Sequence, residues 1–138
     1  MIRRRKIWIA LVVCISTLII AGCEGNSSEE EKIRDVEFTV VSSVDIPEQL
    51  VELIEQRQEE PFKITYSDKK NLYIVVGYGA QPTSGYSIAV KEFYEGANSM
   101  HLQTLLKGPS KTETITEIIT FPYIVLMIED TDKPVQFK

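Results

Sequence analysis

The sequence predicts a domain of the α+β or mainly β class: one N-terminal helix followed by an antiparallel β-sandwich or partly open barrel of about seven strands. Three observations predict this class. Between residues 35 and 138, short segments carry apolar residues at every second position, as half-buried strands do. Residues 46–54 instead carry them at helical spacing. Clusters of Gly, Pro, Asn and Ser separate the segments at short intervals.

The helix is expected after a first strand over residues 36–41. Asp45 suits the N-cap, Pro47 suits the first turn, and Pro61 is expected to end the helix. Glutamates on the opposite side repel one another at i,i+4, so burial of the apolar face has to hold the helix. That face consists of Ile46, Leu50, Leu53 and Ile54.

The segment Asn71–Val90 is expected to form the centre of the sheet. Residues 72–78 are apolar on both faces, as a strand covered on both sides requires. The pattern breaks at residues 77–86 and resumes at Ile88, so two strands are joined by a loop longer than a two-residue turn. Residues 124–128 are also apolar on both faces and predict a second central strand.

Four shorter strands complete the predicted sheet, one of them near an edge. A bulge is expected in the strand over residues 86–94, because Phe93 falls out of phase with Ile88 and Val90. The shorter strands are residues 62–66, 100–106, 111–119 (the one near an edge) and 134–137.

The first 22 residues are expected to be a lipoprotein signal peptide. Basic residues 3–6 precede the apolar run Ile7–Ala21, which is shorter than the roughly 20 residues of a membrane-spanning helix. Small residues then lead to Cys23, and this arrangement resembles the lipobox of bacterial lipoproteins. The resemblance implies that Cys23 is acylated and holds the protein on the extracytoplasmic face of the cell membrane. The alternatives are an ordinary secretory signal and a short anchor helix.

Charge and cysteine content narrow the possible functions. The chain has 15 Lys and Arg against 20 Asp and Glu, and removal of residues 1–22 takes away four basic residues, which leaves a net charge of about −9. This balance argues against binding to nucleic acid or to anionic lipid head groups. Cys14 leaves with the signal and Cys23 is lipidated, so no disulfide is expected. Residues 23–34 are expected to be a disordered acidic tether, and residues 35–138 one globular domain.

Few residues suit catalysis. His101 is the single histidine, and no second histidine or free cysteine accompanies it as a metal ligand. A Ser-His-Asp triad would have to use His101. Residues 77–79, Gly-Tyr-Gly, are too short and too aromatic for a loop that cradles phosphate. We therefore expect no enzyme, no metal and no cofactor.

One turn and two later segments resemble a known family. They are the turn Gln-Pro-Thr-Ser-Gly-Tyr-Ser-Ile at residues 81–88, the pair Gly108-Pro109, and Thr-Phe-Pro-Tyr-Ile-Val at residues 120–125. Together they resemble the C-terminal domain of the protease-complex subunit PrcB family, over about residues 62–137. The resemblance implies a non-catalytic secreted or lipid-anchored module that binds or stabilises a protein partner, for example a surface protease.

The turn is the expected partner-binding site, made of Pro82, Thr83, Ser84, Gly85 and Tyr86. Pro82 fixes one φ angle, Gly85 permits a positive one, and Thr83 and Ser84 offer hydroxyls on a stiff tip. A purely structural role, with Tyr86 packed under the turn, is the alternative. The turn is also similar to the Pro-Thr-Thr-Gly-Tyr loop of chagasin-type cysteine-peptidase inhibitors, whose other two loops have no counterpart here. Peptidase inhibition by the Pro82–Tyr86 loop is the alternative function.

Overall fold

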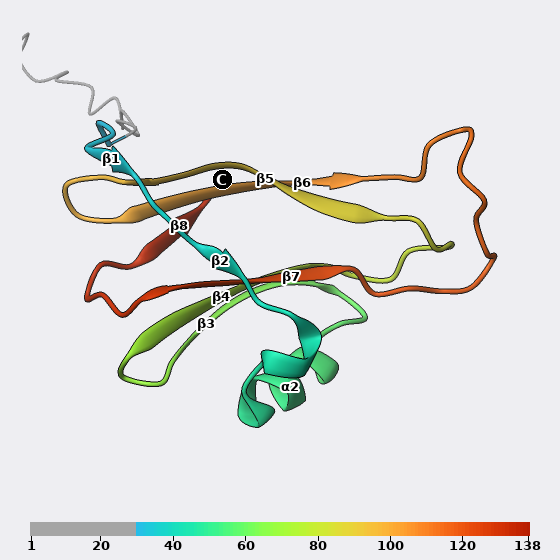
Figure 1. Cartoon of the computed structure of the whole chain (residues 1–138), viewed down its shortest axis with the longest axis horizontal. Coiled ribbons are helices and arrows are strands. Elements are labelled where there is room, and N and C mark those ends of the chain that lie inside the picture. Colours follow the sequence, from blue (N-terminus) through green and yellow to red (C-terminus); the bar gives the residue numbers. More distant parts are fainter. Residues whose placement is uncertain (1–29) are drawn as a thin grey trace, which may run out of the picture.

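The computed structural model describes residues 30–138, which form a sandwich of two β-sheets with one α-helix on its outside (Figure 1). The predicted signal peptide, Cys23 and residues 23–29 lie outside the described residues. Within residues 30–138, no helix has the length and apolar character needed to cross a membrane. In chain order the elements are β1 (Arg34–Asp35), β2 (Thr39–Val40), the 3₁₀ turn η1 (Ser43–Asp45), α2 (Glu48–Glu55), β3 (Pro61–Ser67), β4 (Asn71–Tyr78), β5 (Ser87–Glu95), β6 (Met100–Lys107), β7 (Tyr123–Glu129) and β8 (Val135–Phe137).

Each sheet has four strands. The first sheet has the order β1-β5-β6-β8 and the second the order β2-β7-β4-β3. The mainly β, sandwich-like class is confirmed, and the strands described here do not close into a barrel. The prediction of an antiparallel sandwich is wrong at one edge, because β8 runs parallel to β6. The chain reaches β8 from β7 in the other sheet, so no hairpin joins β8 to β6. The order of elements also differs from the predicted helix followed by about seven strands. Two short strands, β1 and β2, precede the helix, and six strands follow it.

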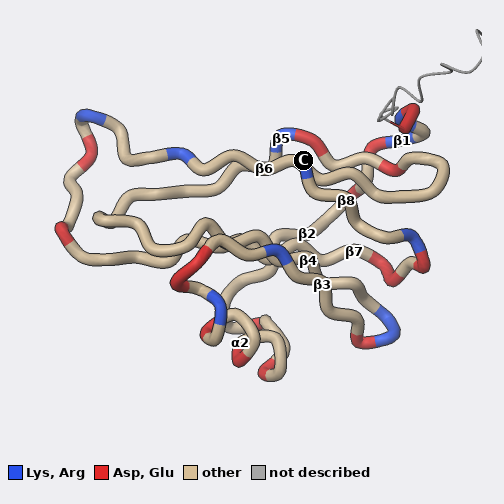
Figure 2. Tube along the Cα trace, turned by 180° about the vertical axis from the view of Figure 1, so that it is seen from behind, with Lys and Arg blue, Asp and Glu red and all other residues tan. Residues whose placement is uncertain are grey.

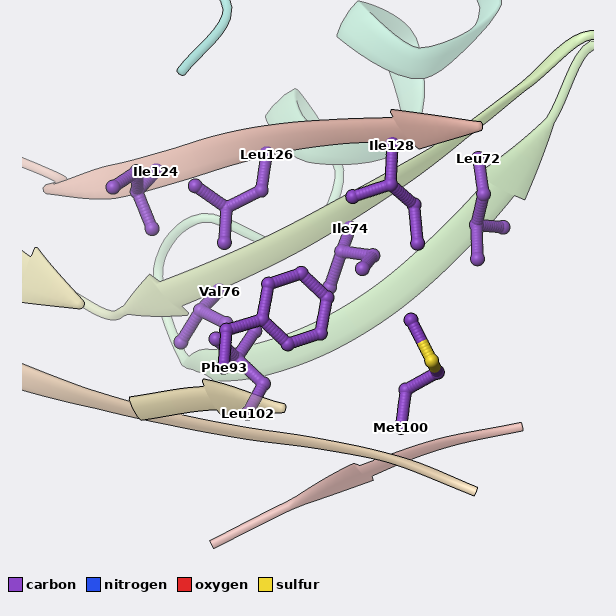
Figure 3. Packing of buried hydrophobic residues seen from close by; sticks show 9 residues of the cluster. All are labelled: Leu72, Ile74, Val76, Phe93, Met100, Leu102, Ile124, Leu126 and Ile128. Carbon is purple, nitrogen blue, oxygen red and sulfur yellow. The ribbon is translucent and has the colours of Figure 1, made fainter. Parts of the chain in front are cut away.

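The main core lies between the sheets, where alternate residues of facing strands meet (Figure 3). Strand β4 is hydrogen-bonded to β3 on one side and to β7 on the other, so it is a central strand as predicted. Strand β7 lies between β4 and β2, which confirms the second predicted central strand. The buried residues of this core are Leu72, Ile74, Val76, Phe93, Met100, Leu102, Ile124, Leu126 and Ile128.

Helix α2 covers the other face of the second sheet. Leu50 and Ile54 are buried against Tyr73, Val75 and Val125, which point outward from β4 and β7. This explains why residues 72–78 are apolar on both faces: one face packs on the first sheet and the other packs under the helix.

The helix boundaries differ from the prediction. Pro47 precedes the first helical residue and provides no side-chain cap, whereas Asp45 belongs to the preceding 3₁₀ turn, where its N–H donates to the carbonyl of Ser42. At the other end the helix stops at Glu55, and residues 56–60 form turns before Pro61 begins β3. The helix is shorter than predicted at both ends because tight turns form the backbone hydrogen bonds there. Asp45 N–H bonds to the carbonyl of Ser42, and Glu60 N–H bonds to the carbonyl of Arg57.

The strand predicted over residues 111–119 does not form. Residues 108–122 are instead a long loop between β6 and β7, with one isolated bridge between Thr120 and Gln81. Exposed side chains along this segment give it no buried face that could hold a strand in register. The bulge predicted in β5 is present, between Val90 and Glu92.

The tether prediction is wrong for residues 30–34, which are packed on the domain. Ile33 N–H donates to the carbonyl of Glu95, and Arg34 begins β1 beside β5. Arg34 and Lys133 both contact the carboxylate of Glu95, with Lys133 Nζ at 2.7 Å, and these cations lower its pKa. Residues 30–34 therefore belong to the folded domain.

Candidate functional site

Both long connections between the sheets lie at one end of the sandwich. Residues 79–86 join β4 to β5 and residues 108–122 join β6 to β7, and Figure 1 shows both loops at the right-hand end. Gln81 N–H donates to the carbonyl of Thr120 at 2.8 Å, and Thr120 N–H donates back to Gln81 at 3.0 Å. We call these two loops the crossover end.

The predicted binding turn lies in the crossover end, but its hydroxyl groups are used within it. Ser84 Oγ accepts a hydrogen bond from Thr116 N–H at 2.8 Å, and Ser84 N–H donates to the carbonyl of Thr116 at 3.0 Å. Thr83 Oγ1 donates to the carbonyl of Ser84, and Thr120 Oγ1 donates to the carbonyl of Thr83. Pro82 is exposed, whereas the four residues after it are half-buried. The turn therefore holds the longer loop in place instead of projecting free hydroxyls.

Gly85 lies where the two loops pack closely together. Its φ is +88°, a conformation that residues with a Cβ rarely adopt, as predicted for this turn. A Cβ at Gly85 would lie 2.8 Å from Cβ of Pro109. Tyr86 packs beside Gly108, so the structural interpretation of Tyr86 agrees with its position. The residues that carry the family resemblance thus meet in one place.

The crossover end also carries exposed branched side chains. Ile115, Ile118 and Ile119 are 42%, 54% and 67% exposed, although they are large and apolar. Hydrogen bonds at Thr116 and Thr120 fix the backbone beside them. Their position on the surface was not predicted, because residues 111–119 were expected to form a strand. We call these three residues the isoleucine surface.

His101 lies at the opposite end of the sandwich in a buried network. Its Nε2 lies 3.0 Å from Glu30 Oε2 and 3.0 Å from Ser99 Oγ, and its ring stacks on Tyr94 with the centroids 4.7 Å apart. In a catalytic triad the acid holds one ring nitrogen and the serine the other, whereas here both contact Nε2. The arrangement is therefore not that of a triad.

Glu30 is the centre of this network. Its carboxylate accepts hydrogen bonds from the hydroxyl and N–H of Ser99 and from the N–H and side-chain amide of Asn98. The hydrogen bonds from Ser99 and His101 lower the pKa of Glu30 from 4.5 to about 2. No feature of the sequence indicated this role, because the bonded residues are 68 to 71 positions away.

The part of the chain that the structure describes contains no group of three or more His, Cys, Asp and Glu residues that could hold a metal ion. A cavity of about 580 Å³ lies near β1 and is lined mainly by polar residues, including Arg34, Glu95 and Asp130. Glu95 there is held by the two cations described above. Neither observation identifies a cofactor site.

Both loops of the crossover end lie within a segment that matches a known protein family. The family model described as PrcB C-terminal matches residues 72–129. The resemblance predicted from the sequence is therefore confirmed over β4 to β7, a segment that contains both loops of the crossover end. No curated protein and no solved structure gave a significant match to the chain.

Proposed function

We propose that this protein is a non-catalytic, lipid-anchored subunit that binds or stabilises a protein partner, such as a surface or secreted protease, on the extracytoplasmic face of the cell membrane. The match of residues 72–129 to the PrcB C-terminal family carries the proposal, since that family is one of protease-complex subunits. The position of His101 supports the non-catalytic part of the proposal, because the imidazole is buried and hydrogen-bonded to Ser99 and Glu30.

The crossover end is the proposed partner-binding surface. Its backbone is fixed by hydrogen bonds between Ser84 and Thr116 and between Gln81 and Thr120, so little conformational entropy is lost when a partner covers it. The isoleucine surface and Pro82 supply apolar contact area, which is the usual core of a protein interface. In this proposal Pro82 touches the partner, and the half-buried residues 83–86 support the contact surface from below.

The anchor is proposed at Cys23, as the lipobox resemblance implies. Glu30 follows Cys23 by seven residues, which span at most about 25 Å when extended. Glu30 is docked at the turn between β5 and β6, and Figure 1 shows this turn at the end of the sandwich opposite the crossover end. An anchor at Cys23 would therefore direct the crossover end away from the membrane, toward a partner in the surrounding space.

The binding surface is tested by capture from a membrane extract with the full anchored chain. A triple serine variant of the isoleucine surface should lose the captured protein, and mass spectrometry should identify that protein as a protease or a component of its complex. The matched control replaces three exposed apolar residues outside the crossover end, Ile33, Val40 and Val44, with serine. Equal capture by both variants, or no enrichment over a bait that carries only residues 1–30, would contradict the proposed surface.

The anchor is tested separately by fractionation. Cys23→Ala should release the protein from membranes that retain the unaltered chain after a salt wash. A variant that still sediments with membranes after the wash would refute lipidation at Cys23, and it would leave the crossover-end experiment unaffected.

A further inference from the structure

A segment of the long loop in the crossover end has the composition of a strand but no strand beside it. Seven of the nine residues 112–120 are Thr or Ile, whose β-branched side chains favour strands. Residues 111–119 are all exposed, and none of the strands that the structure describes pairs with them. The segment is therefore suited to an extended conformation but lacks the neighbouring strand that would stabilise it.

One side of this segment is fixed to the domain at Thr116. The N–H of Thr116 donates to Oγ of Ser84 at 2.8 Å, and its carbonyl accepts from the N–H of Ser84 at 3.0 Å. The bridge between Thr120 and Gln81 fixes the chain again four residues later. Because these bonds already order the backbone, little conformational entropy remains to be lost when a further extended chain pairs with it.

The backbone groups on either side of Thr116 are not bonded to the domain. Within residues 30–138, no hydrogen bond uses the N–H or the carbonyl of Ile115 or Glu117. Successive residues of an extended chain direct these groups to opposite sides, so those of Ile115 and Glu117 lie on the side away from Ser84. Exposed N–H and carbonyl groups without a partner are those to which an added strand binds.

The side chains of the segment indicate the chemistry of the chain that fits beside it. Glu113, Ile115 and Glu117 occupy every second position, so they share one face where the segment is extended. All three are exposed, and none of the ion pairs within residues 30–138 involves either glutamate. Lys111 is the only basic residue of the loop 108–122, and helix α2 is also rich in acidic residues (Figure 2). Complementary side chains are therefore basic opposite the two glutamates and apolar opposite Ile115.

We propose that residues 113–117 bind an extended segment of the protein partner that carries a basic, an apolar and a basic residue at every second position. The backbone of this segment pairs with Ile115 and Glu117, and its basic side chains lie opposite Glu113 and Glu117. Its apolar residue covers Ile115 in the isoleucine surface. The inference rests on the proposed function, because it names the kind of partner segment that the crossover end binds.

The test uses the full chain in nonionic detergent micelles and a fluorescein-labelled peptide, Thr-Lys-Thr-Val-Thr-Lys-Thr, blocked at both ends. Fluorescence anisotropy should show saturable binding, and a peptide of the same composition in the order Lys-Thr-Thr-Lys-Val-Thr-Thr should bind at least about fivefold more weakly.

Variants of the chain locate the binding. Glu113→Lys/Glu117→Lys should weaken it about tenfold. Glu113 also accepts the N–H of Ser110, so Glu117→Lys, which removes no hydrogen bond within residues 30–138, is measured alone and should weaken it about threefold. The matched control Glu52→Lys/Glu55→Lys makes the same change in net charge at exposed positions of α2 and should alter binding less than about twofold.

Amide hydrogen exchange distinguishes backbone pairing from a purely electrostatic contact. Thr116, whose N–H is bonded to Ser84, should be protected with or without peptide. Ile115 and Glu117 should exchange rapidly in the chain alone and become protected when the peptide binds. Absence of saturable binding, equal binding of the two peptides, or binding without protection of Ile115 and Glu117 would overturn the proposal. Protection of both amides without peptide, lost on dilution, would also overturn it, because a second copy of the chain would then occupy the segment.

Capture from the membrane extract separates this inference from the proposed function. Glu113→Lys/Glu117→Lys should lose the captured protein, as the triple serine variant of the isoleucine surface does. If the serine variant loses the protein and the lysine variant retains it, the proposed function stands and the basic partner segment is wrong. If neither variant loses it, the crossover end is not the binding surface.

Discussion

Replacement of Gly85 by alanine tests whether the close contact between the two loops of the crossover end is required. With φ at +88°, a residue with a Cβ is strained by about 1–2 kcal/mol. The new Cβ would also lie 2.8 Å from Cβ of Pro109, a ring carbon that cannot turn aside as a flexible side chain does, so one loop has to shift. We expect a total loss of about 2–3 kcal/mol in the free energy of unfolding.

Gly108 provides the matched control, because it lies in the facing loop. A Cβ there would meet its nearest neighbour, Cε1 of Tyr86, at 3.7 Å, an ordinary van der Waals distance. Urea unfolding of residues 24–138, followed by tyrosine fluorescence, should show a midpoint about 1–2 M lower for Gly85→Ala and little change for Gly108→Ala. If the two variants unfold within about 0.5 kcal/mol of each other, the argument from φ and from the contact with Pro109 is wrong.

Three further predictions test other parts of the molecule. Leu50→Ala should cost about 2–5 kcal/mol in urea unfolding, because this helix residue is fully buried against the second sheet; a loss below 1 kcal/mol would show that the helix contributes little. Docking of Glu30 should be complete above pH 4.5 and be lost as the pH falls toward 2, since its pKa is lowered in the folded state; amide exchange at the turn between β5 and β6 should follow this range, and Glu30→Gln should weaken the dependence. Thr83→Ala/Ser84→Ala should increase amide exchange at Thr116 without global unfolding, and unchanged exchange there would refute the bracing role of the turn.

The residues that were predicted well are those whose environment is set by periodicity alone. Residues 72–78 are apolar at every position, and only a strand between two layers buries both of its faces. The phase change before Phe93 required a bulge, and the bulge is present. Gly85 was expected to have a positive φ because it follows Pro-Thr-Ser in a turn, and it does. In each case the residues next to the position in the sequence are enough to predict its backbone conformation or its burial.

The errors concern features that depend on contacts distant in the sequence. Glu30 was placed in a disordered tether because its neighbours are polar and charged, yet it is docked by Asn98, Ser99 and His101, nearly 70 residues away. Residues 111–119 have the composition of a strand, but Thr116 bonds to Ser84 in another loop, and Thr120, just after this segment, bonds to Gln81. The parallel pairing of β8 likewise depends on where the chain returns after β7. Local propensity does not specify any of these contacts.

In the proposed function, the positions of these long-range contacts separate the anchored end of the domain from the partner-binding end. Glu30 attaches the N-terminal segment at the turn of β5 and β6, whereas Ser84 and Gln81 brace the long loop at the other end of the sandwich. Strands β4 to β7 connect the two ends through one continuous core. A mechanical force applied to the N-terminal segment would therefore act first on the hydrogen bonds of Glu30 and on the short strand β1. It would not act directly on the crossover end. Glu30→Gln should accordingly change the distance between an anchored N-terminus and the domain, while capture of a partner through the isoleucine surface should be unchanged. Loss of capture in that variant would show that the two ends are coupled.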